Sequence, residues 1–308
     1  MKAIVTREYG GPDVLKLEDY PKPTAGPDEV LIKVAATSIN PLDYKQRNGS
    51  VKSIAPIQFP AILGVDVSGT VAALGSGVKN FGVGDRVFAM ANKTYAEFCI
   101  VKAENLARVP DGLDLTEAAA LPLVLTAGYA LVAGTHIEAD QTLLVTGAVG
   151  NVGRSAVFSA KQKGATVIAG VRKKQFEEAG KIGADQLIAL DDPQDIARLP
   201  ELDAVADTIG GNVAKDLIAK VKKGGTYASV VHLPEIASEY PEAKAAFVFT
   251  RPDAKALTSL AEAVRERKLV IPIGFKLPLK DAAKGQAAVE KGVSGKVLLI
   301  VDDESKRA

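Results

Sequence analysis

The chain has 308 residues, of which 47% are hydrophobic and 24% charged, as expected for a folded protein of about two domains. Its 38 basic and 37 acidic residues leave a net charge of +1, so no general attraction to nucleic acid or to an anionic membrane is expected. The single cysteine, Cys99, excludes an intrachain disulfide and every zinc site built from several cysteines, and we expect it in the core. The first residues lack the apolar run of a signal peptide, and we expect a cytoplasmic protein.

The first third of the chain is predicted to form a small β domain. Residues 2–6 and 30–36 are rich in β-branched residues, and the second run is expected to be buried on both faces. Glycines and prolines separate further short runs, which is typical of a compact barrel. Residues 118–134 are apolar but short for a membrane span, and we expect them to form a buried helix.

From residue 142 onward, apolar strand patterns alternate with helical patterns. The expected strands are residues 142–145, 166–170, 186–188, 203–207, 226–231 and 246–249. The expected helices between them are residues 152–163, 174–182, 194–199 and 212–221. This alternation predicts a parallel sheet with helices on both faces, and six such strands make one doubly wound α/β domain.

The last sixty residues change character again. Leu257, Leu260 and Val264 follow helical spacing after the helix-start signal at Asp253. An apolar strand is expected at residues 297–301. This segment is too short to form a comfortable domain alone, so we expect it to return to the N-terminal domain.

The strongest motif follows the strand at 142–145 and reads VTGAVGNVGR over residues 145–154. Gly147 permits a tight turn, Gly150 lets the backbone approach a pyrophosphate, and Gly153 allows close packing of the following helix, whose N-terminus supplies N–H donors. The spacing is GxxGxxG rather than GxGxxG, and the alternative is a plain glycine-rich turn. We predict a dinucleotide-binding loop whose contacts come from Gly147, Val149, Gly150, Asn151, Val152 and Gly153.

The end of the next strand discriminates between NAD and NADP. An acidic residue there would bind the ribose 2′-hydroxyl, but Val171 occupies the position. Three cations follow, Arg172, Lys173 and Lys174, and they suit a 2′-phosphate, whereas the alternative is a solvated basic start of a helix. We therefore predict NADPH as the cofactor.

Four further residues are expected to contact the nicotinamide. Ser229, Val231 and His232 end the fifth strand of the doubly wound domain, and Phe249 ends the sixth. The carboxyl ends of strands face the ligand crevice in such sheets, which places the four residues beside a bound cofactor.

Seven short motifs, in this order and at these distances, carry a resemblance to a known family. They are SINPLDYK (38–45), LGVDVSG (63–69), GDRV (84–87), ALP (120–122) with TA (126–127), the loop 147–153, DAVAD (203–207) and GK (295–296). Over nearly its whole length the chain resembles the zinc-independent medium-chain dehydrogenase/reductases, in the NADPH-dependent quinone oxidoreductase and enone reductase branch. The resemblance implies a homodimer and two domains with a cleft between them. These are a GroES-like β-barrel-type substrate domain from residues 1–120 and 251–308, and a Rossmann domain from residues 121–250.

The zinc-dependent branch of this family does not match. Asn40 stands where that branch has a catalytic cysteine, and Val65 stands where it has a histidine, so neither can be an ordinary zinc ligand. We expect no metal site. Without a Lewis acid, alcohol oxidation is not expected, and what remains is hydride donation from NADPH to a small molecule, a quinone or an α,β-unsaturated carbonyl compound.

The resemblance and the residue chemistry together give candidate catalytic residues. Asn40 is expected to donate a hydrogen bond to a substrate carbonyl or to the nicotinamide ribose, unless it is only a turn residue before Pro41. Tyr44 and Lys45 are candidates for protonating the reduced oxygen or α-carbon; only one of the two adjacent side chains is expected to face the cleft, and similar enone reductases carry a lysine matching Lys45. By resemblance, Thr126 lies near the nicotinamide ribose, unless it is only a helix-interior threonine bonded to its own backbone. The alternative function is an NADPH-binding structural or regulatory protein with little or no turnover.

Overall fold

The computed structural model describes residues 1–301, and its contacts divide the chain into two compact units. Unit 1 contains Met1–Leu123, Pro252–Glu266 and the segment that begins at Ile271. Unit 2 contains Val124–Arg251 and Arg267–Val270. Sequence analysis places the corresponding boundaries after residues 120 and 250.

Unit 1 is built on a seven-stranded sheet with the order β15–β16–β3–β5–β6–β8, in which β7 also pairs with β3, and on a small sheet with the order β2–β1–β4. The bounds are β1 Lys2–Thr6, β2 Lys16–Asp19, β3 Glu29–Ile39, β4 Ala61–Ile62, β5 Asp66–Leu74, β6 Arg86–Met90, β7 Phe98–Lys102, β8 Ala107–Arg108, β15 Ile273–Pro278 and β16 Lys296–Ile300. Strand β3 is central and largely buried along its length, as its unbroken apolar pattern predicts.

The C-terminal segment returns to the N-terminal domain, as predicted. Strand β16 pairs antiparallel with β3, with Val297 opposite Ile39, and β15 extends the same sheet. Cys99 lies buried in the core around β3, also as expected.

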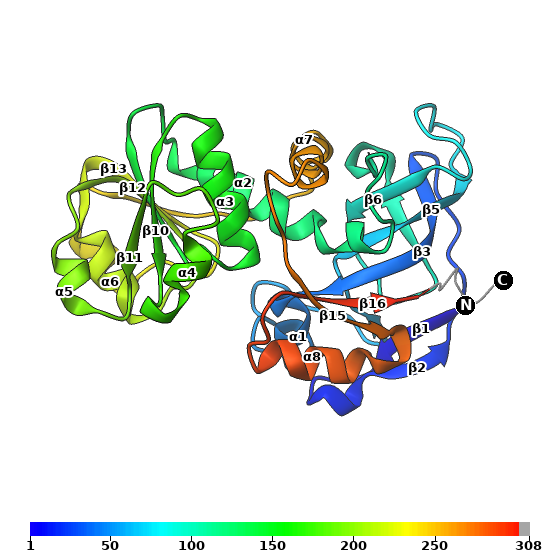
Figure 1. The fold of residues 1–308 in the computed structure, drawn as a ribbon. Helices are drawn as coiled ribbons and strands as arrows, with labels where there is room; N and C mark the ends of the chain where they lie inside the picture. Colours follow the sequence, from blue (N-terminus) through cyan, green and yellow to red (C-terminus); the bar gives the residue numbers. More distant parts are fainter. Residues whose placement is uncertain (302–308) are drawn as a thin grey trace. The chain divides into compact units, whose positions relative to one another are not determined.

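The helices of unit 1 are η1 Pro12–Val14, α1 Pro41–Arg47, η2 Ala103–Asn105, η3 Glu117–Ala120, α7 Ala254–Arg265, η6 Leu279–Asp281 and α8 Ala282–Glu290. Two of them, α1 and α7, begin at side-chain caps. The Asp253 carboxylate accepts a hydrogen bond from the Ala256 N–H, 2.9 Å, which confirms the predicted start of α7. Helices α1 and α8 lie side by side (Figure 1).

The apolar stretch at Glu117–Thr135 forms η3 and then α2, Pro122–Thr135. By length and composition it could cross a membrane, but 72% of its most apolar 18-residue window is buried inside the protein. Buried core helices of soluble proteins satisfy the same criterion, so this stretch is the buried helix that the sequence predicts.

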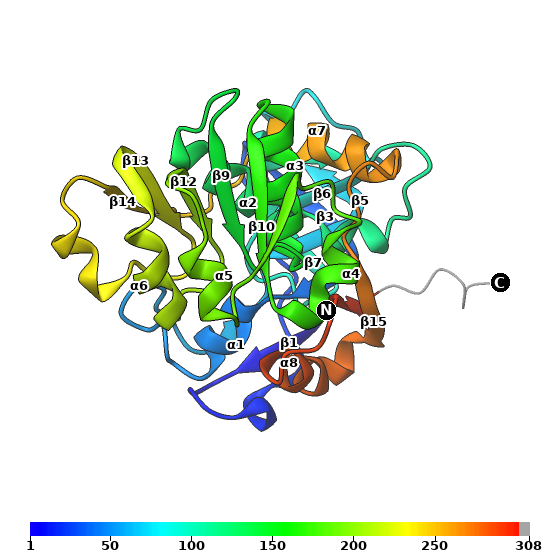
Figure 2. The ribbon, with the colours of Figure 1, turned by 60° about the vertical axis from the view of Figure 1, so that its left-hand side comes forward.

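Unit 2 is a doubly wound parallel sheet with the strand order β11–β10–β9–β12–β13–β14, and Figure 2 labels five of these strands, from β10 to β14 in that order. The bounds are β9 Thr142–Thr146, β10 Thr166–Val171, β11 Gln186–Ala189, β12 Leu202–Asp207, β13 Val221–Ser229 and β14 Lys244–Phe247; the intervening helices are α3 Asn151–Gln162, η4 Lys173–Gln175, α4 Phe176–Ala179, α5 Pro193–Ala197, α6 Asn212–Ile218 and η5 Glu235–Glu239. Apolar residues of α2, α3 and α4 pack on one face of the sheet, and those of α5 and α6 pack on the other. The expected α/β fold class is confirmed.

Several predicted elements have different limits in the structure, among them the helix expected at 212–221, which ends at Ile218 because β13 begins at Val221. The helix expected at 174–182 is only η4 and the four-residue α4, because the chain turns at Gly180 and adopts a positive φ of 80° at Gly183. Strands β13 and β14 end at Ser229 and Phe247 rather than at 231 and 249. These two residues pair with each other, and Ser229 also pairs with Asp207 of β12, so the three strands stop at a common register.

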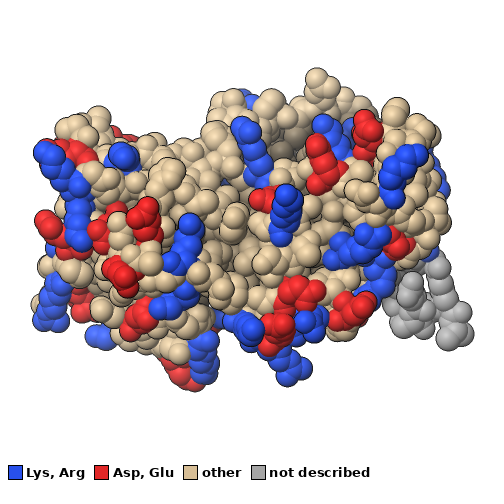
Figure 3. All heavy atoms as spheres, turned by 90° about the horizontal axis from the view of Figure 1, so that it is seen from above, with Lys and Arg blue, Asp and Glu red and all other residues tan. Residues whose placement is uncertain are grey.

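Charged residues of both signs are interspersed over the face shown in Figure 3, and that face has no large area of a single sign. This distribution agrees with the net charge of +1. Any anion site must therefore be built locally.

Candidate functional site

The glycine loop of unit 2 connects β9 to α3 by a tight turn. Gly147 has a φ of +59°, and the Gly150 N–H donates to the Gly147 carbonyl at 2.8 Å. A Cβ on Gly153 would lie 2.2 Å from the Gly147 carbonyl oxygen, so only glycine lets helix α3 pack this closely on the turn. The roles predicted for Gly147 and Gly153 in the turn are therefore met.

The first turn of α3 contains Asn151, Val152 and Gly153, with Gly150 as the N-cap. N–H groups at the start of a helix have no intrahelical acceptor and carry a partial positive charge, which favours an anionic group. Sequence reasoning missed Arg154: its Nε donates to the Val149 carbonyl at 2.9 Å, and its guanidinium forms an ion pair with Glu178. Arg154 thus stabilises the loop through its side chain. The only sequence signal for this role is its position as the last residue of the motif.

The predicted basic triplet lies where β10 ends. Arg172, Lys173 and Lys174 are exposed, and no carboxylate in residues 1–301 forms an ion pair with any of them. The backbone is fixed locally, because the Arg172 N–H donates to the Gln175 side chain at 3.1 Å and the Lys173 N–H donates to Asp191 at 2.8 Å. Three cations with no ion-pair partner in the described chain suit a phosphate group.

The carboxyl ends of β9 and β12 meet at the point where the strand order of the sheet reverses, which is where ligands bind in doubly wound folds. Asp207, fully buried, joins the two ends: it accepts from the Thr146 hydroxyl at 2.8 Å and from the Gly210 N–H at 2.9 Å. The Thr208 N–H in turn donates to the Thr146 hydroxyl at 2.8 Å. The sequence marks Asp207 only through the DAVAD motif, which gives no signal of this role.

Ser229 and His232 are tied into the same structure. The Ser229 hydroxyl donates to Asp207 at 2.8 Å and accepts from the N–H groups of Val231, at 3.1 Å, and His232, at 3.3 Å. The His232 Nε2 accepts from the Gly211 N–H at 3.2 Å, so in the neutral ring the proton is on Nδ1. Ser229 thus shapes the loop after β13, and cofactor contact by these residues stays a prediction.

The two remaining predicted residues of unit 2 are Phe249 and Thr126. Phe249 follows β14 and is 65% exposed, with its ring edge-on to Phe247 at a centroid distance of 4.6 Å. Thr126 is buried on α2. Their predicted contacts with the nicotinamide are not tested by these positions.

In unit 1, Asn40 lies at the centre of a buried polar cluster. Its Nδ2 donates to Asp66 Oδ2 at 2.7 Å, and its Oδ1 accepts from Lys296 Nζ at 2.7 Å. Asp66 also accepts from the Ser38 hydroxyl, from Lys296 Nζ at 3.3 Å and from the Leu123 N–H at 2.7 Å. The sequence marks Asp66 and Lys296 only through their motifs, because nothing in it shows that positions 230 residues apart form an ion pair.

Asp43, three residues after Asn40, caps helix α1 through a hydrogen bond from the N-cap backbone N–H. Its Oδ2 accepts from the Asn40 N–H at 2.8 Å and from the Tyr95 hydroxyl at 2.8 Å, while its Oδ1 is buried without a partner in the described chain. Burial raises the pKa of Asp43 to about 7, although both hydrogen bonds act in the opposite direction. Burial, together with the Asp43 charge, also raises the pKa of Tyr95.

Tyr44 and Lys45 follow on α1, and both are half-buried. Their side chains make no hydrogen bond or ion pair with other described residues. The structure does not favour one of them over the other as a proton donor, so both stay predictions.

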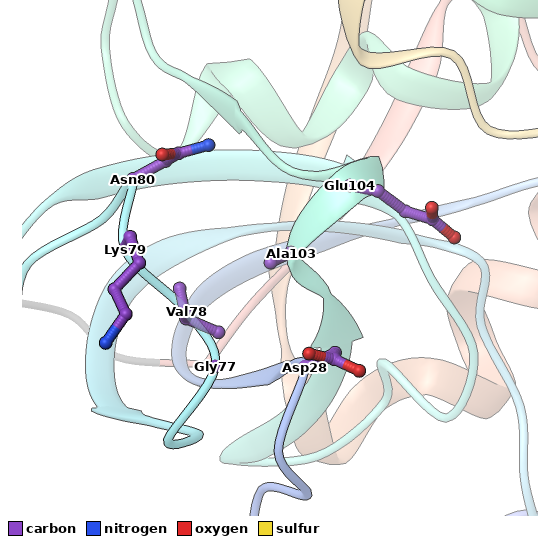
Figure 4. Close-up of a pocket in the computed structure, with 7 residues that line it drawn as sticks. All are labelled: Asp28, Gly77, Val78, Lys79, Asn80, Ala103 and Glu104. Atoms are coloured by element: carbon purple, nitrogen blue, oxygen red, sulfur yellow. The ribbon is translucent and has the colours of Figure 1, made fainter.

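A surface pocket of about 320 Å³ in unit 1 is separate from all these residues (Figure 4). Its lining includes Asp28, Lys79 and Glu104, and Lys79 extends on the opposite side from the two carboxylates. No predicted site residue lines it. Within residues 1–301, no group of three or more His, Cys, Asp or Glu side chains is arranged to hold a metal ion.

Comparison with known proteins places the chain in a family. Residues 26–129 match the alcohol dehydrogenase GroES-like domain, and residues 182–299 match the family described as zinc-binding dehydrogenase. The chain is 31% identical to the chloroplast envelope quinone oxidoreductase homolog of Arabidopsis thaliana, over 97% of its own length and 98% of that protein. The chain belongs to the medium-chain dehydrogenase/reductase family. The resemblance inferred from the seven motifs is thereby confirmed.

Two further likenesses agree. The chain is 35% identical to the NADPH-dependent alkenal/one oxidoreductase of Arabidopsis thaliana over 73% of its own length, and the match spans 61% of that protein, less than two thirds. The solved quinone oxidoreductase from Coxiella burnetii superimposes with a TM-score of 0.87 at 31% identity, covering 98% of this chain and 99% of that one. This reductase branch of the family is the one that the sequence resembles.

Proposed function

We propose that this protein is an NADPH-dependent reductase that transfers hydride to a quinone or an α,β-unsaturated carbonyl compound without zinc. The printed names of its relatives support an oxidoreductase of this class. The observation that carries the zinc-free part is the cluster of Lys296, Asn40 and Asp66.

Asn40 of that cluster, and Val65 next to Asp66, stand at positions where the zinc-dependent branch has ligands. Asn40 and Val65 replace a cysteine and a histidine, and the Lys296 ammonium lies 2.7 Å from Asn40 Oδ1. A zinc ion beside this ammonium would meet charge repulsion and only one carboxylate, that of Asp66. The phrase "zinc-binding dehydrogenase" describes the family that matches residues 182–299. Asn40 and Val65 do not provide the cysteine and histidine ligands of the zinc-dependent branch.

Unit 2 fits a dinucleotide phosphate. The close packing of Gly153 on Gly147 shapes the loop, and the start of α3 presents N–H groups to a pyrophosphate. Arg172, Lys173 and Lys174 would bind the 2′-phosphate of the adenosine ribose, which distinguishes NADPH from NADH. Asp207 does not bind the cofactor in this proposal; it holds the strand ends in place.

NADPH supplies the hydride when it is bound. The protein must then stabilise the charge that develops on the acceptor oxygen and deliver one proton to that oxygen or to the α-carbon. Asn40 Nδ2 would donate a hydrogen bond to the oxygen, and either the Tyr44 phenol or the Lys45 ammonium would supply the proton. Hydride plus proton reduce the quinone to a hydroquinone, or the enone to a saturated ketone.

The test is NADPH oxidation with a 1,4-quinone, an enone and an enal as acceptors, and alcohol oxidation with NADP⁺ as a control. Each reaction is run with and without EDTA. Turnover with a quinone or an enone that EDTA does not change would support the proposal. Loss of turnover with EDTA and its return with zinc would refute the zinc-free assignment.

NADPH binding without turnover on any acceptor would instead favour a structural or regulatory protein of the same fold. A small-molecule substrate follows from the proposed reaction. The homodimer and the cytoplasmic location stay predictions; equilibrium sedimentation and cell fractionation test them.

A further inference from the structure

Three adjacent strands of unit 1 bring together the groups that hold Asn40. Strands β16, β3 and β5 are neighbours, and the register that places Val297 opposite Ile39 puts Lys296 beside Asn40. Asp66 begins β5 at the same end of the sheet. Lys296 is 3% exposed and Asp66 is fully buried, so the pair is held out of water.

These partners fix which way the Asn40 amide points. Lys296 Nζ can only donate, so the amide atom 2.7 Å from it must be the acceptor Oδ1. The Asp66 carboxylate can only accept, so the atom 2.7 Å from it must be Nδ2. A flipped amide would place donor against donor and acceptor against acceptor, at a cost that water does not relieve in this buried place.

One amide proton remains available in this arrangement. Nδ2 carries two protons, and one is donated to Asp66. No other described residue accepts a hydrogen bond from Nδ2. The Lys296 charge beside Oδ1 draws electron density away from the nitrogen and makes the second N–H a stronger donor.

We propose that Lys296 is a positioning residue of the reaction: with Asp66 it orients and polarises the Asn40 amide so that the free Nδ2 proton is aimed at the carbonyl oxygen of a quinone or enone. This inference rests on the proposed function, and it adds the residue that sets the direction and strength of the donor. Lys296 acts through Asn40 and does not itself transfer a proton.

A buried ion pair is weak evidence of stabilisation, since its Coulomb attraction is offset by the loss of hydration. The Lys296–Asp66 pair depends on specific partners. Asp66 accepts hydrogen bonds from four different donors, and Lys296 donates only to Asn40 and Asp66 in the described chain. An apolar residue at position 296 would fill the same space and would need no hydrogen-bond or ion-pair partner. The use of a lysine here is explained by a role that needs a charge beside the Asn40 amide.

The experiment measures kcat and KM for a 1,4-quinone with NADPH, using the full chain. Lys296→Met removes the ammonium and its charge at similar volume. We expect kcat to fall about 30- to 100-fold, at or below the roughly 100- to 1,000-fold cost of removing a transition-state donor, because the Asn40 amide is still present. The Kd of NADPH, measured by its fluorescence, should change less than twofold. Lys296→Arg restores a charge, and it should recover at least a third of the lost kcat on a logarithmic scale. Lys291→Met, at an exposed lysine of the same unit, is the control and should leave kcat within twofold of the wild-type value.

A double-mutant cycle separates this role from a structural one. If Lys296 acts through Asn40, adding Lys296→Met to Asn40→Ala should cost less than threefold in kcat beyond Asn40→Ala alone. Independent, multiplicative losses would overturn the proposal. So would a folded Lys296→Met variant with an unchanged kcat and only a lowered melting temperature.

Two controls keep the outcome decisive. If Lys296→Met does not fold, Lys296→Gln keeps an N–H donor without the charge and should still lower kcat more than tenfold; an unchanged kcat refutes the proposal. If the wild-type chain binds NADPH but reduces no acceptor, the proposed function fails first and the role of Lys296 fails with it. If the wild type is active and Lys296→Met equally so, only the inference about Lys296 fails.

Discussion

The carboxyl group of Asp43 should make the stability of unit 1 depend on pH in a direction opposite to that of an ordinary ion-paired carboxylate. Burial raises the pKa of Asp43 from 3.8 to about 7 in the folded state. The folded state therefore holds this proton to a higher pH than the unfolded state. Its contribution to stability is fully present below about pH 4 and is lost as the pH rises through about 7.

The size of the effect follows from the shift. Roughly three pKa units correspond to about 4 kcal/mol over the whole range, at about 1.4 kcal/mol per unit. Between pH 5 and pH 8 the expected loss is about 2.5 kcal/mol, since folding takes up nearly one proton at pH 5 and almost none at pH 8. The pKa of Asp85, in contrast, is lowered by a hydrogen bond from the Gly82 N–H and by the neighbouring Arg108, so Asp85 contributes in the opposite sense.

The Asp43→Asn variant isolates this contribution. An asparagine oxygen can still accept from the Asn40 N–H and the Tyr95 hydroxyl, but the side chain does not titrate. The free energy of unfolding of Asp43→Asn minus that of the wild type, from urea denaturation followed by circular dichroism, should increase by about 2.5 kcal/mol from pH 5 to pH 8. Asp13→Asn, at an exposed carboxylate of the same unit, is the matched control.

A difference that does not change between pH 5 and pH 8 would refute the reasoning. A carbon-13 titration of the Asp43 carboxyl group by NMR provides a check that does not depend on unfolding. An apparent pKa near 4 would show that the two hydrogen bonds outweigh burial.

Three other perturbations test the candidate sites. Arg172→Ala should weaken NADPH binding about tenfold or more and leave NADH binding nearly unchanged, since a charge-assisted hydrogen bond contributes about 1.5–3 kcal/mol; equal losses for both cofactors, measured by fluorescence titration, would contradict the 2′-phosphate assignment. Gly153→Ala should reduce NADPH affinity more than tenfold, because the alanine Cβ would clash with the Gly147 carbonyl oxygen. Gly180→Ala is the control and should not reduce NADPH affinity in this way, because a Cβ there would lie 3.6 Å from its nearest neighbouring atom. Asp207→Asn should destabilise unit 2 by about 2–4 kcal/mol in urea unfolding, because an amide has one acceptor oxygen where the carboxylate has two, and its NH2 group cannot accept. A loss under 1 kcal/mol would show that the network rearranges.

The order of elements in unit 2 could be predicted because the sequence expresses it locally. Short apolar runs alternate with helical patterns, and the glycines at 147, 150 and 153 mark the turn that follows β9. The end of a strand could not be predicted in this way where it depends on the neighbouring strands. Strand β13 stops at Ser229 because its neighbours β12 and β14 stop there, and that information lies 22 and 18 residues away along the chain.

The candidate residues of unit 1 show the same division. Asn40 could be selected from its motif, but its partners could not. The pairing of Asn40 with Lys296 joins positions 256 residues apart, and it exists only because β16 returns to β3. Sequence analysis predicts that return, yet the register that places the two side chains together depends on how the whole sheet packs.

Both units place one fully buried carboxylate at the end of their sheet and surround it with donors from neighbouring strands. Asp66 gathers the Ser38 hydroxyl, the Asn40 amide and the Lys296 ammonium; Asp207 gathers donors from the ends of β9 and β13 and from its own following turn. A buried carboxylate with these donors is costly to disturb, because removing any one donor leaves part of a charge without a partner. The loops that follow the strands are therefore held in one arrangement before any ligand arrives. Such preorganisation is what hydride transfer needs, since the protein contributes position and electrostatics rather than the reacting atoms.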